Sequence, residues 1–239
     1  MRALSDKDIE ALANRVNRAY RQLPEAKEEP YRVNPELLIT KLLGLTVKYR
    51  HLSPNRIALG VTAFLPMEIE VFDGPEEFVP LDGKTVLVEE DLTRPGAVIG
   101  RKHFTLAHEG CHHILHMAFP KRYDNSIVGR KPLYYRLDHV PVEIEERETD
   151  RLASALLMPA DLLFDNLAQC GIPNGIHILN SITRPREYEK FVQVSTIMGV
   201  SKQALSIRMR KLGLLDKEYL QNPFKILDIY KEDDEDERV

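Results

Sequence analysis

The chain has 239 residues, 43% of them hydrophobic and 29% charged, which is enough for one sizeable core with an appendage or for two small domains. The formal net charge of −4 comes from the last nine residues, which hold six acids and two bases, while the other 230 residues carry 31 of each. This balance provides no basic field for nucleic acid or anionic membranes. No apolar run approaches about 18 residues, the start is polar, and the two cysteines make no disulfide framework. We therefore expect a cytoplasmic protein that does not span a membrane.

Helix signals open the chain. Ser5 is a suitable N-cap and Asp8 stands three residues later, so a first helix is predicted, and Pro24 ends it. A second helix is predicted from its cap at Asn34 to Gly44, which lies just past its end.

Residues 45–90 change from helical spacing to short apolar or alternating runs. These runs lie near 47–51, 57–61, 69–72 and 85–88. Asp82-Gly83 is typical of a hairpin turn and leads into the last of them. We predict a small sheet of three to five strands.

Helical spacing returns further along the chain. It covers about 98–119, 143–158 as far as Pro159, 161–169, and 186–213, the last as two helices joined at Gly199. Residues 120–142 mix proline, glycine and charge and are predicted to form a long loop. The expected fold class is α+β.

Five of the eight histidines lie between His103 and His116, and they include His108-Glu-Gly-Cys-His112, an HExxH motif. At about 100° per residue, His108 and His112 share one helix face with apolar residues, so both imidazoles are expected to point inward. Two inward histidines one turn apart suit a divalent metal, and Glu109 beside them can act as a base on a metal-bound water. The alternative is a buried histidine pair satisfied by backbone and water.

Tetrahedral zinc requires a third protein ligand. The helix at 143–158 offers Glu143, Glu145, Glu146 and Glu148. Helical spacing places Glu146 on the buried stripe and Glu148 on the outward side. Because a buried carboxylate needs a partner, Glu146 is the predicted ligand, and Asp150, one turn on, is predicted to accept a hydrogen bond from a ligand histidine. The alternative is a structural ion pair.

Three neighbours of the motif have weaker claims. His116 is one turn beyond His112, but three ligands from one straight helix fit a tetrahedral site poorly, so a structural or supporting role is predicted. His113 is expected to face elsewhere. Cys111 shares the face of the two histidines and is a candidate soft ligand, although a small buried hydrophobe is the preferred interpretation.

Two segments, Phe104–His116 and Glu146–Pro159, resemble the paired motifs of the ImmA/IrrE family of metallopeptidases. Thr149 and Leu152 replace the family's alanine and phenylalanine, and neither is the proposed ligand. The segment Val200–Leu214 is also similar to a segment toward the end of family members, so the resemblance extends over most of the chain.

The resemblance implies a zincin-like fold in which a small twisted sheet packs beside the HExxH helix. It implies one Zn²⁺ per chain in a gluzincin-like site, with ligands matching His108, His112 and Glu146 and a catalytic residue matching Glu109. It also implies a narrow substrate, a partner helix-turn-helix repressor whose cleavage derepresses genes of a mobile element or a stress response. We expect an N-terminal helix (1–30), a zincin-like metallopeptidase domain (31–175), a helix-turn-helix-like segment (176–216) and an acidic tail (217–239).

The pair of helices at 186–213 has the pattern of a helix-turn-helix, with Ser201 as the cap of the second helix. That helix carries Lys202, Arg208, Arg210 and Lys211, and Lys202, Arg208 and Lys211 are its candidate DNA contacts. Because the rest of the chain adds no basic charge, packing and recruitment of the repressor are favoured over DNA binding.

Two functions follow from these patterns. The leading one is a zinc endopeptidase, which also needs an oxyanion-stabilising group. The candidates for that group are Tyr134, Tyr135, His139 and His103. The rival is a non-proteolytic transcriptional regulator that uses the zincin scaffold and the helix-turn-helix-like segment to bind DNA or protein. Glu109 argues against the rival, because a purely structural metal needs no base.

Overall fold

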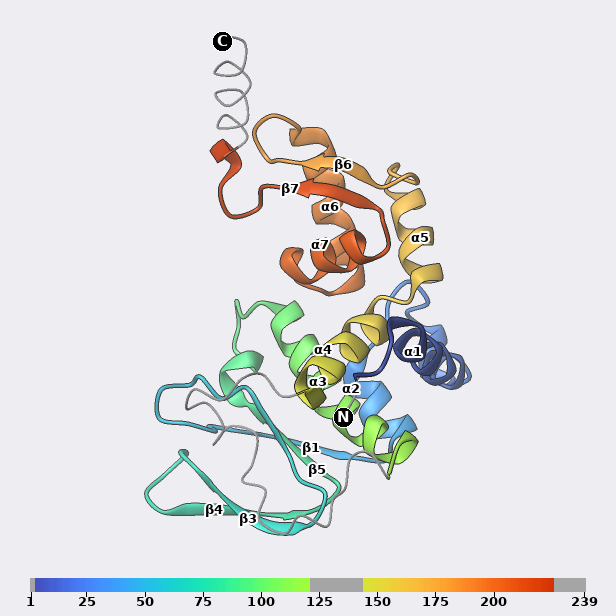
Figure 1. Ribbon diagram of the computed structural model, residues 1–239. Coiled ribbons are helices and arrows are strands. Elements are labelled where there is room, and N and C mark those ends of the chain that lie inside the picture. Colours follow the sequence, from blue (N-terminus) through green and yellow to red (C-terminus); the bar gives the residue numbers. More distant parts are fainter. Residues whose placement is uncertain (1–2, 121–143, 226–239) are drawn as a thin grey trace, which may run out of the picture. The chain divides into compact units, whose positions relative to one another are not determined.

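The computed structural model describes residues 3–120 and 144–225 of the chain (Figure 1). The fold is mixed α+β, as predicted, and it divides into two compact units, Met1–Pro159 and Ala160–Val239. The division assigns residues 160–175 to the second unit, whereas the predicted metallopeptidase domain extends to 175. Within the described part of the chain, no helix combines the length and apolar character that crossing a bilayer requires.

The first helix, α1 (Asp6–Tyr20), begins with a capping box. The Ser5 hydroxyl accepts a hydrogen bond from the Asp8 backbone N–H at 3.2 Å, and the Asp8 carboxylate accepts one from the Ser5 N–H at 3.1 Å. These two bonds satisfy N–H groups that a helix start otherwise leaves without partners. The apolar side of α1 is buried and packs against α4 (Ile144–Leu157). The predicted first helix is therefore confirmed.

The second predicted helix is also confirmed, although it changes type along its length. A short 3₁₀ turn, η1 (Glu25–Lys27), precedes it. Asn34 caps α2 (Pro35–Leu37) by accepting two backbone hydrogen bonds, and the helix continues as a π-helical turn, η2 (Leu38–Leu42). Gly44, with φ +67°, ends it.

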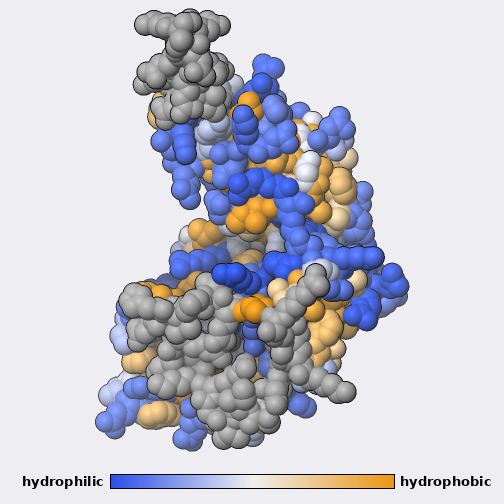
Figure 2. All heavy atoms as spheres, in the orientation of Figure 1, coloured by the Kyte–Doolittle hydropathy of each residue, from blue (hydrophilic) through white to orange (hydrophobic). Residues whose placement is uncertain are grey.

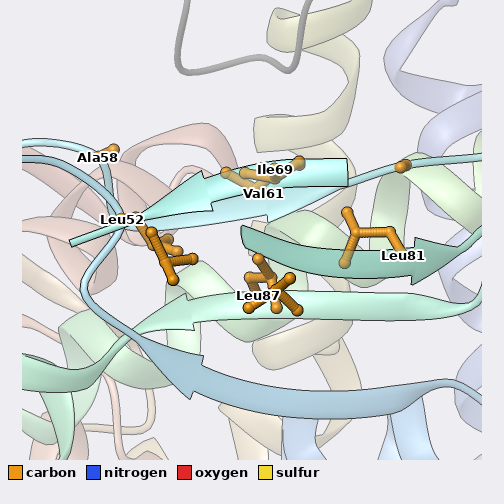
Figure 3. Packing of buried hydrophobic residues seen from close by; sticks show 9 residues of the cluster. Leu52, Ala58, Val61, Ile69, Leu81 and Leu87 are labelled. Carbon is orange, nitrogen blue, oxygen red and sulfur yellow. The ribbon is translucent and has the colours of Figure 1, made fainter. Parts of the chain in front are cut away.

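Five strands follow, within the predicted number, but they form two sheets and not the single sheet that was predicted. β1 (Thr46–Arg50), β5 (Thr85–Glu89) and β2 (Gly60–Thr62) form one sheet in that order, with β1 parallel and β2 antiparallel to β5. β3 (Pro66–Val71) and β4 (Glu77–Asp82) form an antiparallel hairpin. A cluster of buried apolar side chains joins the two sheets, with Val61 and Leu87 from the first and Ile69 and Leu81 from the second (Figure 3).

The predicted hairpin at Asp82-Gly83 is wrong as a pairing, although a tight turn is present. Gly83 has φ +81°, and the Asp82 carboxylate accepts hydrogen bonds from the Lys84 N–H and the Thr85 hydroxyl, each at 2.9 Å. The strands on either side of this turn belong to different sheets. β5 is buried along its whole length and already pairs with β1 and β2 on its two edges, so no edge is left for β4.

After the 3₁₀ turn η3 (Glu90–Thr93), α3 (Ile99–Ala118) and α4 pack side by side, and both confirm predicted helices. The helix α3 also contacts β2 and the α2–η2 segment. At Gly110 the approach is so close that an added Cβ would collide with Ile39 of η2.

The second unit contains α5 (Ala160–Gln169), β6 (Ile176–Leu179), α6 (Pro185–Met198), α7 (Lys202–Lys211), β7 (Leu215–Glu218) and η5 (Pro223–Lys225). The predicted turn between α6 and α7 is confirmed, because Gly199 is left-handed at φ +65° and the Ser201 side chain caps α7. The parallel pairing of β6 with β7 was not predicted. In the view of Figure 2, hydrophilic residues cover most of the described surface, with hydrophobic residues in small groups between them.

Candidate metal centre

The HExxH motif lies in the middle of α3, where helical periodicity brings His108 and His112 to one side. Their Nε2 atoms are 3.1 Å apart. The Oε2 atom of Glu146 on α4 is 3.3 Å from His108 Nε2 and 3.7 Å from His112 Nε2. The corners of a tetrahedron with bonds of about 2.0 Å to its centre are about 3.3 Å apart, so the three atoms have the spacing of zinc ligands. This cluster is a group that could hold a metal ion.

Asp150 and Glu145 contact the Nδ1 atoms of His108 and His112, respectively. The structure places Asp150 Oδ1 2.9 Å from His108 Nδ1, the contact predicted for it. Glu145 Oε1 lies 3.3 Å from His112 Nδ1 and 2.9 Å from His116 Nε2. Carboxylates in these positions fix the ring orientation and leave each Nε2 facing Glu146. His116 thus has the supporting place predicted for it.

The sequence did not predict the role of Glu145, because helical spacing pointed only to a metal ligand. Burial would raise the pKa of Glu145, but hydrogen bonds to His112 and His116 outweigh it and hold this pKa well below its usual range. Glu145 therefore stays ionised and can accept N–H bonds from both rings. The adjacent ring of Phe64 stacks on His116, with centroids 3.8 Å apart.

The prediction that Glu148 faces outward is wrong. Its side chain is fully buried, and its Oε1 accepts a hydrogen bond from the Leu4 backbone N–H at 2.5 Å. Glu146 is half-buried, with 20% of its side chain exposed. Helical periodicity predicts a single buried side, but α4 packs against α3 and also against α1. Glu146 lies on the side of α4 that contacts α3, whereas Glu148 lies beside the segment that leads into α1.

Glu109 is almost completely buried, with 4% exposed, beside the two histidines. Burial raises the pKa of its carboxyl, against the opposing charges of His108 and His112. Its Oε2 atom has no hydrogen-bond partner among residues 3–120 and 144–225. A buried carboxylate oxygen without a donor is costly, so this atom has the surroundings expected of one that meets a water or a substrate.

His108 has a strongly perturbed pKa. Burial would lower it, but hydrogen bonds to Asp150 and Glu146 and the charge of Glu109 raise it to about 10. In the metal-free protein His108 is therefore an imidazolium at neutral pH. A metal ion has to displace this proton, because a ligand histidine is neutral.

The remaining residues near the motif have structural surroundings. His113 points to β2, where its Nε2 is 2.6 Å from the Thr62 hydroxyl, and burial followed by the charges of His112 and His116 lowers its pKa to about 4. Cys111 is fully buried, and burial raises the pKa of its thiol well above the usual range, as fits a small buried hydrophobe.

Three of the four oxyanion candidates, Tyr134, Tyr135 and His139, lie outside the described residues, as does Glu143. His103 is half-buried on α3.

A second group with metal-like spacing consists of His51, Glu89 and Asp91, but its two carboxylates already have partners. Glu89 accepts from the Leu52 N–H at 2.9 Å, and its other oxygen is 2.7 Å from His51 Nδ1. Asp91 pairs with Arg94 at 2.8 Å. The Glu89 contacts join the ends of the parallel strands β1 and β5, which is a structural role.

The DNA-contact prediction is wrong for Arg208, whose side chain is fully buried on α7 together with Leu205 and Met209. Arg208 lies three residues after Leu205 and directly before Met209, so it falls on the buried stripe of the helix. Lys202 and Lys211 are exposed, and the Lys202 ammonium donates to the Tyr188 hydroxyl at 2.9 Å.

No family model and no curated protein matches this chain. Its function therefore has to be inferred from its own residues.

Proposed function

We propose that this chain is a zinc-dependent endopeptidase with a zincin-like metallopeptidase unit. The observation that carries the proposal is the spacing of three ligand atoms, His108 Nε2, His112 Nε2 and Glu146 Oε2, beside a buried glutamate. Two imidazoles and one carboxylate are a common ligand set of catalytic zinc sites, which leave the fourth position open for water.

The residues around this set also fit a zinc ion. The Nδ1 atoms of both histidines face carboxylates, Asp150 for His108 and Glu145 for His112, which orients their Nε2 atoms toward the proposed ion. The buried Oε2 of Glu109, which has no hydrogen-bond partner within the described ranges, is available to a bound water.

When bound, zinc brings the pKa of a coordinated water near neutrality and polarises the substrate carbonyl. Glu109 then accepts the proton of the attacking water and can pass it to the leaving amine. Burial raises the pKa of Glu109, which makes its carboxylate a stronger base than an exposed glutamate. Asp150 and Glu145 hold the two imidazoles in place throughout.

The proposed substrate is a partner helix-turn-helix repressor, whose cleavage derepresses genes of a mobile element or a stress response. This assignment is supported by the resemblance of the α3, α4 and α7 segments to the ImmA/IrrE motifs. The helix pair of the second unit is the proposed recruiting element. With Arg208 buried, one of the three candidate DNA contacts is removed, which weakens the regulator alternative.

The test is metal-dependent cleavage. Purified protein is expected to contain about one zinc per chain. It should cleave a helix-turn-helix repressor encoded beside it, with loss of activity after treatment with 1,10-phenanthroline and recovery on adding zinc. Mass spectrometry of the products would identify the bond. Cleavage that persists at full rate in metal-free protein would contradict the proposal.

Metal binding is expected to strengthen as pH rises. The pKa of His108 is raised to about 10 in the metal-free protein, so below that pH each binding event displaces one proton. The apparent zinc affinity should therefore increase about tenfold per pH unit between about pH 6.5 and 8.5. Competition with a chromophoric chelator at several pH values measures this slope.

Asp150→Asn is the matched control for that slope. It removes the carboxylate whose hydrogen bond raises the pKa of His108, so the dependence on pH should become shallower. An affinity that stays flat across this range in the unmodified protein would show that His108 carries no proton to displace.

A further inference from the structure

At Gly60, strand β2 lies against the side of α3 that carries Glu109. An ideal Cβ added to Gly60 would lie 2.8 Å from both the Cγ and the Cδ atoms of Glu109, and closer still to Oε1. Non-bonded carbon atoms do not come this close, so a Cβ at position 60 would force the Glu109 side chain or the strand to move. The Glu109 side chain therefore fills the space that any residue other than glycine would take at position 60.

Position 60 does not need glycine for its backbone. Gly60 is not among the glycines with positive φ, and its strand pairs in regular antiparallel register with β5, opposite Val88. Alanine would be allowed there and would be preferred in a strand, because glycine loses more conformational entropy on folding. The feature that requires glycine is the neighbouring carboxylate.

Alternation along β2 fixes this contact. Gly60 and Thr62 share one face of the strand, whereas Val61 points into the apolar cluster between the sheets. Thr62 is anchored to the same helix by its contact of 2.6 Å with His113 Nε2. On the other side of Gly60, the Leu59 carbonyl accepts a hydrogen bond from the Glu89 N–H at 2.9 Å. Both neighbours are held, so the strand has little freedom to move away from Glu109.

We infer that Gly60 is a positioning residue for the base. Its Cα, which carries no side chain, packs against Glu109 and determines where the Glu109 carboxylate lies relative to the His108–His112 pair. The inference rests on the proposed function for its effect on cleavage, but the contact itself does not depend on metal or substrate. A larger residue would push the carboxylate out of place while leaving the three proposed ligands untouched.

The contact is tested by a double-mutant cycle on metal-free protein. Gly60→Ala is expected to lower Tm by about 3 °C or more when Glu109 is present. In the Glu109→Ala background the same change should cause no loss, because the collision is gone. Gly74→Ala is the control, since its added Cβ would meet only Glu77 at an ordinary 3.6 Å. Equal losses in both backgrounds, or no loss in either, would overturn the inference.

The effect on the base is tested separately. Gly60→Ala should retain about one zinc per chain while kcat falls by about 100-fold, the order expected for a misplaced catalytic group, and KM changes by less than about twofold. Unchanged kcat would show that Gly60 does not position the base. If the unmodified protein cleaves no repressor, the proposed function fails, and the stability cycle still decides whether Gly60 holds Glu109. If Gly60→Ala alone does not fold, recovery of folding by Glu109→Ala supports the contact and failure to recover contradicts it.

Discussion

Glu109→Gln is expected to abolish repressor cleavage while zinc remains bound. Glutamine has nearly the same shape, but its amide cannot accept the proton of the attacking water, and general-base catalysis typically contributes about 10²- to 10⁴-fold. The residue lies outside the group of three proposed ligands, so zinc content should stay near that of the unmodified protein. Single-turnover cleavage and metal analysis of the same preparation measure both effects.

The same substitution is expected to stabilise the metal-free protein. Burial raises the pKa of Glu109, so in the folded state its ionised form is disfavoured, and at neutral pH this costs stability. A neutral amide removes that cost, so the free energy of unfolding in urea should rise. Cleavage that remains within tenfold of the unmodified rate would refute the assignment of Glu109 as the base.

Glu146→Gln is expected to remove zinc from the protein, whereas Glu148→Gln is expected to retain it. Glu146 places a carboxylate oxygen near both histidine Nε2 atoms, at 3.3 and 3.7 Å. A neutral amide oxygen is a poor zinc ligand, so affinity should fall by more than about 100-fold. A chelator competition measures it, and circular dichroism should show that the metal-free variant stays folded.

Glu148→Gln should instead lower the free energy of unfolding. Its carboxylate is fully buried and accepts the Leu4 N–H, so the change weakens a charge-assisted hydrogen bond and costs about 1–3 kcal/mol. Urea unfolding of the two variants in metal-free form, together with their zinc content, separates the two roles. Loss of zinc from the Glu148 variant, with zinc retained by the Glu146 variant, would show that the third ligand had been assigned to the wrong glutamate.

Local signals predicted the elements around the site well. Caps at Ser5, Asn34 and Ser201 and the left-handed Gly199 act within a few residues of themselves, so the sequence contains all the information that they need. The HExxH face is also local, because helical spacing alone brings His108 and His112 together. Helical spacing also predicted the third proposed ligand, Glu146.

Most of the failures share a cause, which is packing between segments far apart in the chain. Glu148 was expected on an outer face because periodicity considers one helix at a time, and α4 in fact has neighbours on two sides. Arg208 differs, because the spacing of its own helix puts it on the buried stripe of α7. The pairing of β5 with β1 and β2 depends on which edges are free, which no turn signal reveals. The contact of Gly60 with Glu109 joins residues 49 positions apart, and a glycine in a strand gives no sign of what it faces.

The pairing of β6 with β7 determines how the second unit can be divided. β6 precedes α6 and β7 follows α7, so the two helices are enclosed between strands that bond to each other, with hydrogen bonds from Ile176 to Leu214 and from Tyr219 to Leu179 at either end. A fragment cut to the helix pair alone would lose both strands, and with them the buried side chains of Leu179 and Leu215. The smallest piece whose two ends are joined by backbone pairing runs from β6 through Tyr219, and the helix pair excised without these strands would lack that pairing.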